Sequence, residues 1–354
     1  MLSLVLGTLI LQNPSKRFSH FPDTALGVIF LQENYMARRP RHTEYGQMYE
    51  MVFRAKEGIP LPCTKYMNLL VSGTLAKTLK RGGITLCDFV VMGNHWHILF
   101  VPHCKSKLRD FCAELKSTLT RIVKRVLGLQ ESLHLWDGRS TTMQVLDIDK
   151  AKERIVYLYS NPAKANLVSS ITRYPGVSSW AAYSRATPTL NARVESLYPF
   201  VRERHIKAIG TKTSQAYEEE LRALVERDIP LVVEPHAWME AFGITDDEDV
   251  ALVHEEILDR IKANEEQLAV ERRQKKRALM SRRLLTTQRP TVTGWKPKTK
   301  ERRLFFLSSC KQLRLEFLRY FEAFCSTCRE LYKAWKAGTY PKDWPPEAYL
   351  PQHP

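Results

Sequence analysis

Residues 47 to 185 carry a hydrophobic pattern that switches between strand-like and helix-like spacing. The strand-like stretches alternate apolar and polar positions or form short apolar runs bounded by turn residues. They are Met48–Phe53, Ile84–Val91, His95–Val101 and Thr141–Leu146. The turn signal Gly93-Asn94 separates the second stretch from the third, which predicts an antiparallel hairpin.

Three helices are predicted between and after these strands. Apolar residues at three- and four-residue spacing mark 64–80, 105–127 and a segment that begins near Asp149 and continues through Tyr157. We expect Pro162 to stop or kink the third helix. The order is βαββαβ followed by a helix, which favours an α+β fold with a ferredoxin-like split βαβ arrangement and an antiparallel sheet.

After residue 190 the pattern becomes mostly helical. Ser214–Glu226 is one candidate helix, Asp246 to about Leu285 is one long helix or two, and 304–337 is again helical. Within this half, Arg272–Arg303 is dense in Lys and Arg and has a single acid, Glu301. Proline and glycine interrupt that segment, so we expect a basic linker there.

These patterns divide the chain into five parts. They are an N-terminal extension (1–45), an α+β domain (46–188), a helical region (189–271), the basic linker (272–303) and a helical segment with a Pro-rich tail (304–354). The composition changes at Met36, which favours a translation start there over a poorly ordered extension or a weak export signal.

The charge balance narrows the class of partner. The 354 residues include 54 Lys and Arg against 38 Asp and Glu, a net charge of +16. Such an excess indicates a polyanion, either nucleic acid or an anionic membrane surface. The chain lacks the apolar run of roughly 18 residues that a membrane-spanning helix needs. Nucleic acid is therefore the favoured partner, and no membrane is expected.

The cysteines indicate a reducing compartment. The chain has seven of them, an odd number at irregular spacing, which argues against a disulfide framework and favours the cytoplasm. Cys325 and Cys328 form a lone CxxC in a helical stretch without nearby histidines. We interpret this pair as helix-packing thiols rather than as a zinc or redox site.

The candidate chemistry begins with His95 and His97. Side chains two positions apart on a strand leave the same face, so both imidazoles can point at one spot while Trp96 packs on the other side. Two such imidazoles form half of a metal site. By themselves they are more often structural than metal-binding, and a metal would need a third ligand.

Tyr157 and Asn161 provide candidates for the missing groups. They are four residues apart on a predicted helix and so share a face. Two imidazoles and one amide oxygen suit a divalent ion such as Mg²⁺ or Mn²⁺. A tyrosine beside that ion can attack a phosphodiester. Tyr159 is the competing nucleophile, but it lies about 200° around the helix from Tyr157.

Four blocks of sequence resemble the single-tyrosine HUH transposases, and most of all the REP-associated tyrosine transposases of the IS200-like group. The blocks are Gly93–Leu99, Leu135–Arg139, Tyr157–Val168 and Tyr174–Trp180. They occur in the family's order within residues 47 to 185, so the resemblance covers about 40% of the chain. Two positions depart from the family pattern: Gly93 stands where proline is common, and the residue between the histidines is the bulky Trp96.

The resemblance implies a ferredoxin-like HUH endonuclease domain that cuts and rejoins single-stranded DNA. It implies that Tyr157 is the catalytic nucleophile, forming a 5′-phosphotyrosine link and a free 3′-OH. It also implies that His95, His97 and Asn161 hold the divalent metal. The expected partner is single-stranded or hairpin DNA, bound by a monomer or a homodimer, and no nucleotide cofactor is needed.

Two rival functions compete with this prediction. A domesticated protein that binds hairpin DNA without cutting it would have no chemical need for all four site residues. A metal-dependent hydrolase of small substrates would not explain the net charge of +16. We also expect basic side chains on two segments to contact DNA phosphates. They are Lys116, Arg121, Lys124, Arg125, Arg272, Arg273, Lys275, Lys276 and Arg277.

Overall fold

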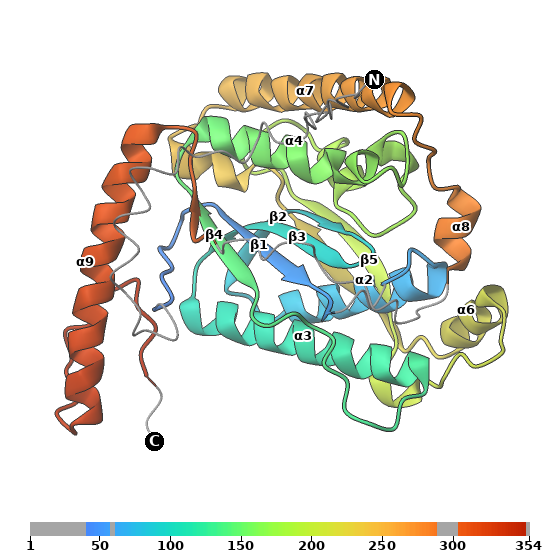
Figure 1. Ribbon diagram of the computed structural model, residues 1–354, viewed down its shortest axis with the longest axis horizontal. Coiled ribbons are helices and arrows are strands. Elements are labelled where there is room, and N and C mark those ends of the chain that lie inside the picture. The colour runs from blue at the N-terminus through green and yellow to red at the C-terminus, as the bar shows by residue number, and fades with distance from the viewer. Residues whose placement is uncertain (1–39, 57–60, 289–303, 352–354) are drawn as a thin grey trace, which may run out of the picture. The chain divides into compact units, whose positions relative to one another are not determined.

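A mainly antiparallel sheet in the order β2-β3-β1-β4-β7 lies at the centre of the protein. The computed structural model describes residues 40–56, 61–288 and 304–351 (Figure 1). Strands β1 to β4 pair with one another in antiparallel fashion, and β7 adds to β4 in parallel. The strands are β1 (Tyr49–Arg54), β2 (Ile84–Val91), β3 (His95–Pro102), β4 (Thr141–Val145) and β7 (Phe306–Leu307).

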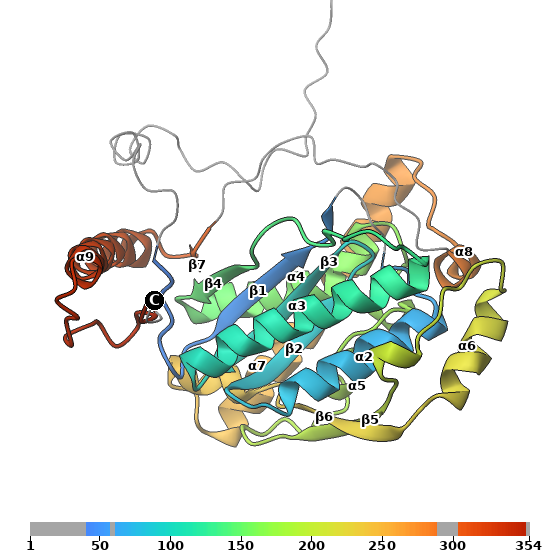
Figure 2. The same ribbon diagram turned by 90° about the horizontal axis from the view of Figure 1, so that it is seen from below.

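Two layers of helices cover the two faces of this sheet (Figures 1 and 2). Helices α2 (Lys65–Leu79) and α3 (Lys105–Leu127) lie on one face, while α4 (Ile148–Lys164) and α7 (Asp247–Gln274) lie on the other. The connection order and the strand order β2-β3-β1-β4 are those of a ferredoxin-like split βαβ arrangement. The predicted α+β fold class is confirmed.

The two faces of β3 pack into different cores. Trp96, Ile98 and Phe100 lie in the cluster on the α2 and α3 side, whereas Leu99 and Val101 lie in the cluster on the α4 side. This alternation follows from the two-residue period of a strand. His95 and His97 belong to the second set, so the fold directs both imidazoles toward α4.

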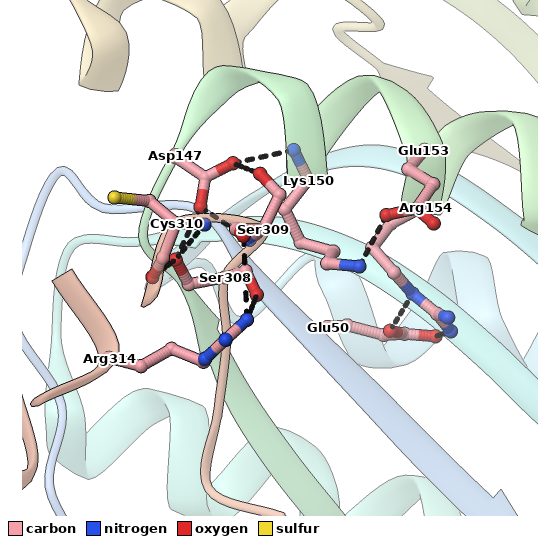
Figure 3. A network of polar contacts seen from close by, with 9 residues as sticks. All are labelled: Glu50, Asp147, Lys150, Glu153, Arg154, Ser308, Ser309, Cys310 and Arg314. Atoms are coloured by element: carbon pink, nitrogen blue, oxygen red, sulfur yellow. Dashed lines mark hydrogen bonds and ion pairs between the residues drawn. The ribbon is translucent and has the colours of Figure 1, made fainter. Parts of the chain in front are cut away.

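Helix α4 is fixed at its N-terminus by a shared aspartate. Asp147 caps the helix by accepting from the Lys150 backbone N–H at 2.8 Å. It also accepts from Ser308 Oγ at 2.5 Å and from the Ser309 backbone N–H at 2.8 Å (Figure 3). The segment that follows β7 is therefore tied to the start of α4, since Ser308 and Asp147 are 161 residues apart in the chain.

The sequence predicted that Pro162 stops or kinks α4, and the stop is wrong. The helix continues to Lys164, two residues beyond the proline. A proline inside a helix loses one backbone hydrogen bond. Pro162, like its neighbours Asn161 and Ala163, is buried, and packing of this last turn against the core offsets that loss.

The region 189–271 is not helical throughout, which corrects the sequence expectation. Strands β5 (Val194–Phe200) and β6 (Arg227–Val233) form a separate antiparallel pair that packs on α2. The contact is close at Gly73, where a Cβ would lie 2.3 Å from the Pro199 carbonyl oxygen. Helix α2 is buried on most of its surface because this pair covers the side that the sheet leaves open.

Helices α6 (Ser214–Ala223), α8 (Arg282–Thr287) and α9 (Lys311–Lys336) fall on segments predicted to be helical. The short helix α5 (Trp180–Tyr183) and the 3₁₀ turns η3 (Ile171–Arg173), η4 (Glu203–His205) and η5 (Ala237–Phe242) were not predicted. The long segment predicted from Asp246 is thus two helices, α7 and α8. Cys325 and Cys328 are buried on α9 against Phe321 and Phe324, as expected for packing thiols.

Several predictions fall partly or wholly outside the described residues. Most of the extension 1–45, including Met36, and residues 289–303 of the basic linker are among them. The chain divides into two units, 1–40 and 41–354, and the functional boundaries at 188 and 271 within the second unit stay predictions. In the described part of the chain, the helices are too short or too polar to cross a membrane.

Candidate active site

His95 and His97 stand side by side at the start of β3. Their ring centroids are 5.1 Å apart and the rings are almost perpendicular, at 82°. His95 is opposite Arg54 in the register with β1, so the pair lies at the end of the central strand. His97 is only 5% exposed. The strand therefore holds both imidazoles close together at one end of the sheet, with His97 buried and His95 partly exposed.

Each of these histidines uses its Nδ1 to bind an oxygen atom. His97 Nδ1 lies 2.7 Å from Glu50 Oε1, and His95 Nδ1 lies 2.6 Å from Asn94 Oδ1. Carboxylate and amide oxygens accept hydrogen bonds, so the proton sits on Nδ1 of both rings and Nε2 keeps its lone pair. Among the described residues, His97 Nε2 is buried without a hydrogen-bond partner. This arrangement is typical of imidazoles that bind a metal.

The electrostatics keep these groups in the required charge states. Burial lowers the pKa of His95 to about 3, assisted by the neighbouring His97 and Arg54, so the ring is neutral at physiological pH. Burial by itself would raise the pKa of Glu50, but the Arg154 guanidinium and the His97 hydrogen bond lower it to about 2. The carboxylate is therefore ionised although it is only 1% exposed.

Helix α4 brings Tyr157 and Asn161 to the histidines. The Tyr157 ring lies 5.6 Å from the His97 ring, at an angle of 77°, and Asn161 Nδ2 lies 3.4 Å from His95 Nε2. Turning the amide by 180° would place its oxygen at the same position, as a metal ligand requires. The four residues singled out from the sequence thus meet at one place.

Two cations lie over the ring of Tyr157. Arg154 Cζ is 4.3 Å from the ring centroid and Lys164 Nζ is 4.8 Å from it. With Asn161, these residues are spaced three or four positions apart on α4 and share one face. The face that looks at the histidines therefore combines a phenol, an amide and two positive charges.

Tyr159 occupies the opposite side of α4. It is fully buried, its hydroxyl donates to Asp88 Oδ1, and the Ser179 hydroxyl lies 2.8 Å away. Burial raises the pKa of Asp88 to about 7, against the hydrogen bonds from Tyr159 and Ser179. Tyr159 is thus part of the core between the sheet and α7, and the structure does not bring it to the histidines.

The two groups of predicted DNA-contacting residues lie on different sides of the sheet. The α3 group covers the face away from the histidines, where Lys116 Nζ donates to the Gly138 carbonyl at 2.6 Å and Arg121 pairs with Glu203 at 2.5 Å. Lys124 and Arg125 lie on the same helix.

The second group lies at and beyond the end of α7, which packs along α4. Its members are Arg272, Arg273, Lys275, Lys276 and Arg277. Shortly after this group, the Met280 N–H donates to the Asn166 carbonyl at 2.9 Å, just past the end of α4. The fold therefore brings this group, and not the α3 group, to the side of Tyr157.

Four residues of this site were missed from the sequence. They are Glu50, Asn94, Arg154 and Lys164. Glu50 is the one charged residue in the apolar stretch Met48–Phe53, and such a charge in a buried strand is a signal for a specific partner. Arg154 and Lys164 share the helical spacing of Tyr157 and Asn161. The buried charge and the helical spacing are both visible in the sequence, but neither shows which residue Glu50 or Arg154 contacts.

Within the described residues, no group of three or more His, Cys, Asp or Glu side chains is arranged to hold a metal ion. A metal at the histidine pair would therefore depend on the Asn161 amide and on oxygen ligands from outside the protein. The unpartnered His97 Nε2 and the donor set of two imidazoles and one amide fit Mg²⁺ or Mn²⁺.

Comparison with known proteins supports a family for this part of the chain. Residues 43–179 match the family model described as "Transposase IS200 like". The search of curated proteins finds no match. One similar solved structure is that of a REP-associated tyrosine transposase bound to a REP hairpin, which is 15% identical. The match covers 42% of this chain and 86% of the other, with a TM-score of 0.34. Residues 43–179 of this chain are therefore similar to the IS200-like transposases.

Proposed function

We propose that this protein cuts and rejoins single-stranded DNA with Tyr157 as the nucleophile. The observation that carries the proposal is the meeting of Tyr157 and Asn161 on α4 with the two histidines of β3, both of which retain a lone pair on Nε2. This set contains a nucleophile and three candidate metal ligands. The resemblance to single-tyrosine transposases implies the same roles.

The proposed chemistry is a reversible exchange of phosphodiester bonds. The Tyr157 hydroxyl oxygen forms a bond to phosphorus, the bond from phosphorus to the 3′ oxygen breaks, and the phenolic proton is transferred so that a 3′-OH is left. The 5′ side stays attached as a phosphotyrosine. In the second step a 3′-OH attacks that phosphorus, and the tyrosine leaves and regains its proton. No nucleotide cofactor is required, because each bond broken is replaced by another.

His95, His97 and Asn161 are the residues that would hold a divalent ion. When bound, Mg²⁺ or Mn²⁺ would withdraw charge from the phosphate oxygens. The Lys164 ammonium lies over the Tyr157 ring and belongs to an exposed residue, so it is available to a DNA phosphate. We therefore place the reaction at the face of α4 that carries Tyr157, Asn161 and Lys164.

The proposed substrate is single-stranded DNA, presented at a hairpin as the resemblance implies. The net charge of +16 and the basic residues 272–277 beside the end of α4 support a polyanionic strand on this side. The odd number and irregular spacing of the seven cysteines support a reducing cytoplasm. A monomer or a homodimer is compatible with this proposal.

Covalent adduct formation tests the proposal. The protein is incubated with labelled single-stranded hairpin DNA and Mn²⁺ or Mg²⁺, and a denaturing gel is used to detect an adduct. We expect an adduct that EDTA prevents and that His97→Ala abolishes, with hairpin binding by His97→Ala retained in a mobility-shift assay. Hairpin binding by the wild type without any adduct would contradict nuclease activity and favour a non-catalytic hairpin-binding protein.

A further inference from the structure

Glu50 and Arg154 connect the strand beside the histidines to the helix that carries Tyr157. Arg154 Nε donates to Glu50 Oε2 at 2.7 Å, and Arg154 Nη2 donates to Oε1 at 2.7 Å (Figure 3). Oε1 also accepts from His97 Nδ1 at 2.7 Å. The carboxylate is buried, so one side chain of β1 holds a histidine of β3 and an arginine of α4 at the same time.

We propose that Glu50 and Arg154 are positioning residues that set the histidine for metal binding and hold the nucleophile in register with it. The inference rests on the proposed function, because it assigns roles relative to Tyr157 and the metal. Neither residue is proposed to touch the DNA or the metal. Each acts through a neighbour: Glu50 through His97, and Arg154 through Tyr157.

Glu50 determines which nitrogen of His97 is available. An ionised carboxylate only accepts hydrogen bonds, so the His97 proton must sit on Nδ1 and the lone pair on Nε2. Nε2 is the buried atom that has no hydrogen-bond partner among the described residues. A carboxylate behind the ring also raises the basicity of the coordinating nitrogen. Glu50 therefore orients the ring and strengthens it as a ligand.

Arg154 keeps this carboxylate charged and links it to helix α4. A buried carboxylate needs a paired cation, and the planar guanidinium binds both of its oxygens at once. The same guanidinium lies 4.3 Å from the centroid of the Tyr157 ring, one helical turn along α4. The imidazole, the carboxylate, the guanidinium and the phenol ring thus form one continuous chain of contacts.

A second ion pair on α4 offers a matched control. Lys152 Nζ lies 2.6 Å from Glu256 Oε2 and joins α4 to α7 on the side away from the sheet. The Glu256 side chain is 45% exposed, compared with 1% for Glu50. Glu256→Gln therefore removes a carboxylate that pairs with the same helix through Lys152 and not through Arg154. Because the Glu256 carboxylate is open to solvent, we expect its removal to cost less stability than removal of the buried Glu50 carboxylate.

The first measurement needs no metal and no DNA. Long-range ¹H–¹⁵N correlation spectra of protein labelled with ¹⁵N-histidine report the tautomer of each ring. We expect His97 to carry its proton on Nδ1 in the wild type and to become a mixture of tautomers in Glu50→Gln, because an amide can donate as well as accept. Glu256→Gln should keep the wild-type spectrum.

The second measurement is Mn²⁺ affinity, followed by adduct formation at saturating Mn²⁺. We expect Glu50→Gln to weaken Mn²⁺ binding by about 10- to 100-fold, with no change in Glu256→Gln. The double variant Glu50→Gln/Arg154→Gln leaves no buried charge unpaired. It therefore replaces the single variant in these measurements if Glu50→Gln does not fold. We expect it to form adducts roughly 10- to 100-fold more slowly even when Mn²⁺ saturates, because the ring of Tyr157 is no longer held.

The outcomes separate this inference from the proposed function. Unchanged tautomer, Mn²⁺ affinity and adduct rate in Glu50→Gln and the double variant would overturn the positioning roles, as would equal losses in Glu256→Gln. A wild type that binds no Mn²⁺ through His97 would instead overturn the metal site and the proposed function. The tautomer spectra would still decide whether Glu50 orients His97.

Discussion

In the part of the chain that the structure describes, two pairs of adjacent, largely buried histidines differ in how they use Nε2. In the pair His95 and His97, each ring binds an oxygen through Nδ1 and keeps the lone pair of Nε2. In the pair His236 and His254, His236 Nε2 lies 2.9 Å from His254 Nδ1, and His236 Nδ1 lies 2.9 Å from the Thr189 carbonyl oxygen.

In the second pair, the acceptor nitrogen of His236 is satisfied inside the protein. A carbonyl oxygen only accepts, so His236 must carry its proton on Nδ1, and its Nε2 then accepts from His254 Nδ1–H. The His254 ring also stacks on Tyr183, with centroids 4.8 Å apart. Burial and proximity are common to both pairs. The difference is what the Nε2 lone pair meets. His236 Nε2 accepts from the other histidine of its pair, whereas His97 Nε2 has no hydrogen-bond partner among the described residues.

The same contrast separates two tyrosines of α4. Tyr157 is partly exposed and lies beside His97, whereas Tyr159 is buried and donates its hydroxyl proton to Asp88. A nucleophile must reach its substrate, and a buried hydroxyl that is already bonded to a carboxyl group does not. Two residues of sequence separation thus place one phenol at the candidate site and the other in the core.

The largest effect should come from replacing the two tyrosines separately. We expect Tyr157→Phe to reduce covalent DNA adducts at least about 1000-fold, because no other hydroxyl takes its position. Tyr159→Phe should form adducts at close to the wild-type level but lose roughly 1–3 kcal/mol of unfolding free energy, since the buried Asp88 loses the hydrogen bond from Tyr159. Adducts are measured on denaturing gels and stability by chemical denaturation. Adducts that persist in Tyr157→Phe and vanish in Tyr159→Phe would reverse the assignment.

A smaller effect is expected from the second histidine pair. His254→Ala removes a buried ring that bonds to His236 and stacks on Tyr183, so we expect a loss of roughly 3 kcal/mol in unfolding free energy. Mn²⁺ affinity, measured by titration calorimetry, should stay within about twofold of the wild type. His97→Ala is the matched variant and should abolish Mn²⁺ binding. Loss of Mn²⁺ binding in a folded His254→Ala protein would remove the distinction between the two pairs.

The part of the site that depends on local geometry could be predicted from the sequence. His95 and His97 share a face because strands have a two-residue period, and Tyr157 and Asn161 share one because helices have three to four residues per turn. The contact of Glu50 with Arg154 joins residues 104 positions apart. Local spacing does not determine such a contact, because it depends on how α4 lies across β1.

The strand pair β5 and β6 was missed for a different reason. Each strand contains a proline, Pro199 and Pro230, and proline argues against a strand because it donates no backbone hydrogen bond. A two-stranded sheet has two edges, where such residues are tolerated. What stabilises the pair is its packing on α2 at Gly73, a contact that the pattern within either strand does not reveal.

The smallest predicted effect concerns the acid response of the second histidine pair. Burial lowers the pKa of His236 from 6.5 to about 4, and burial also lowers the pKa of His254. The unfolded chain therefore takes up protons first as the pH falls below about 6.5, and the stability that the neutral pair provides is lost as the pH approaches 4. Asp88 acts in the opposite direction, because its pKa is raised to about 7 and it favours the folded state at low pH.

Comparing the wild type with His236→Asn isolates the histidine contribution, since both proteins carry Asp88. The asparagine amide can donate to the Thr189 carbonyl in place of Nδ1 but does not titrate in this range. We expect the stability advantage of the wild type to shrink by roughly 2 kcal/mol between pH 7 and pH 4.5. Denaturant titrations at several pH values measure this difference. An advantage that stays constant with pH would mean that His236 is not held neutral by its bonds to Thr189 and His254.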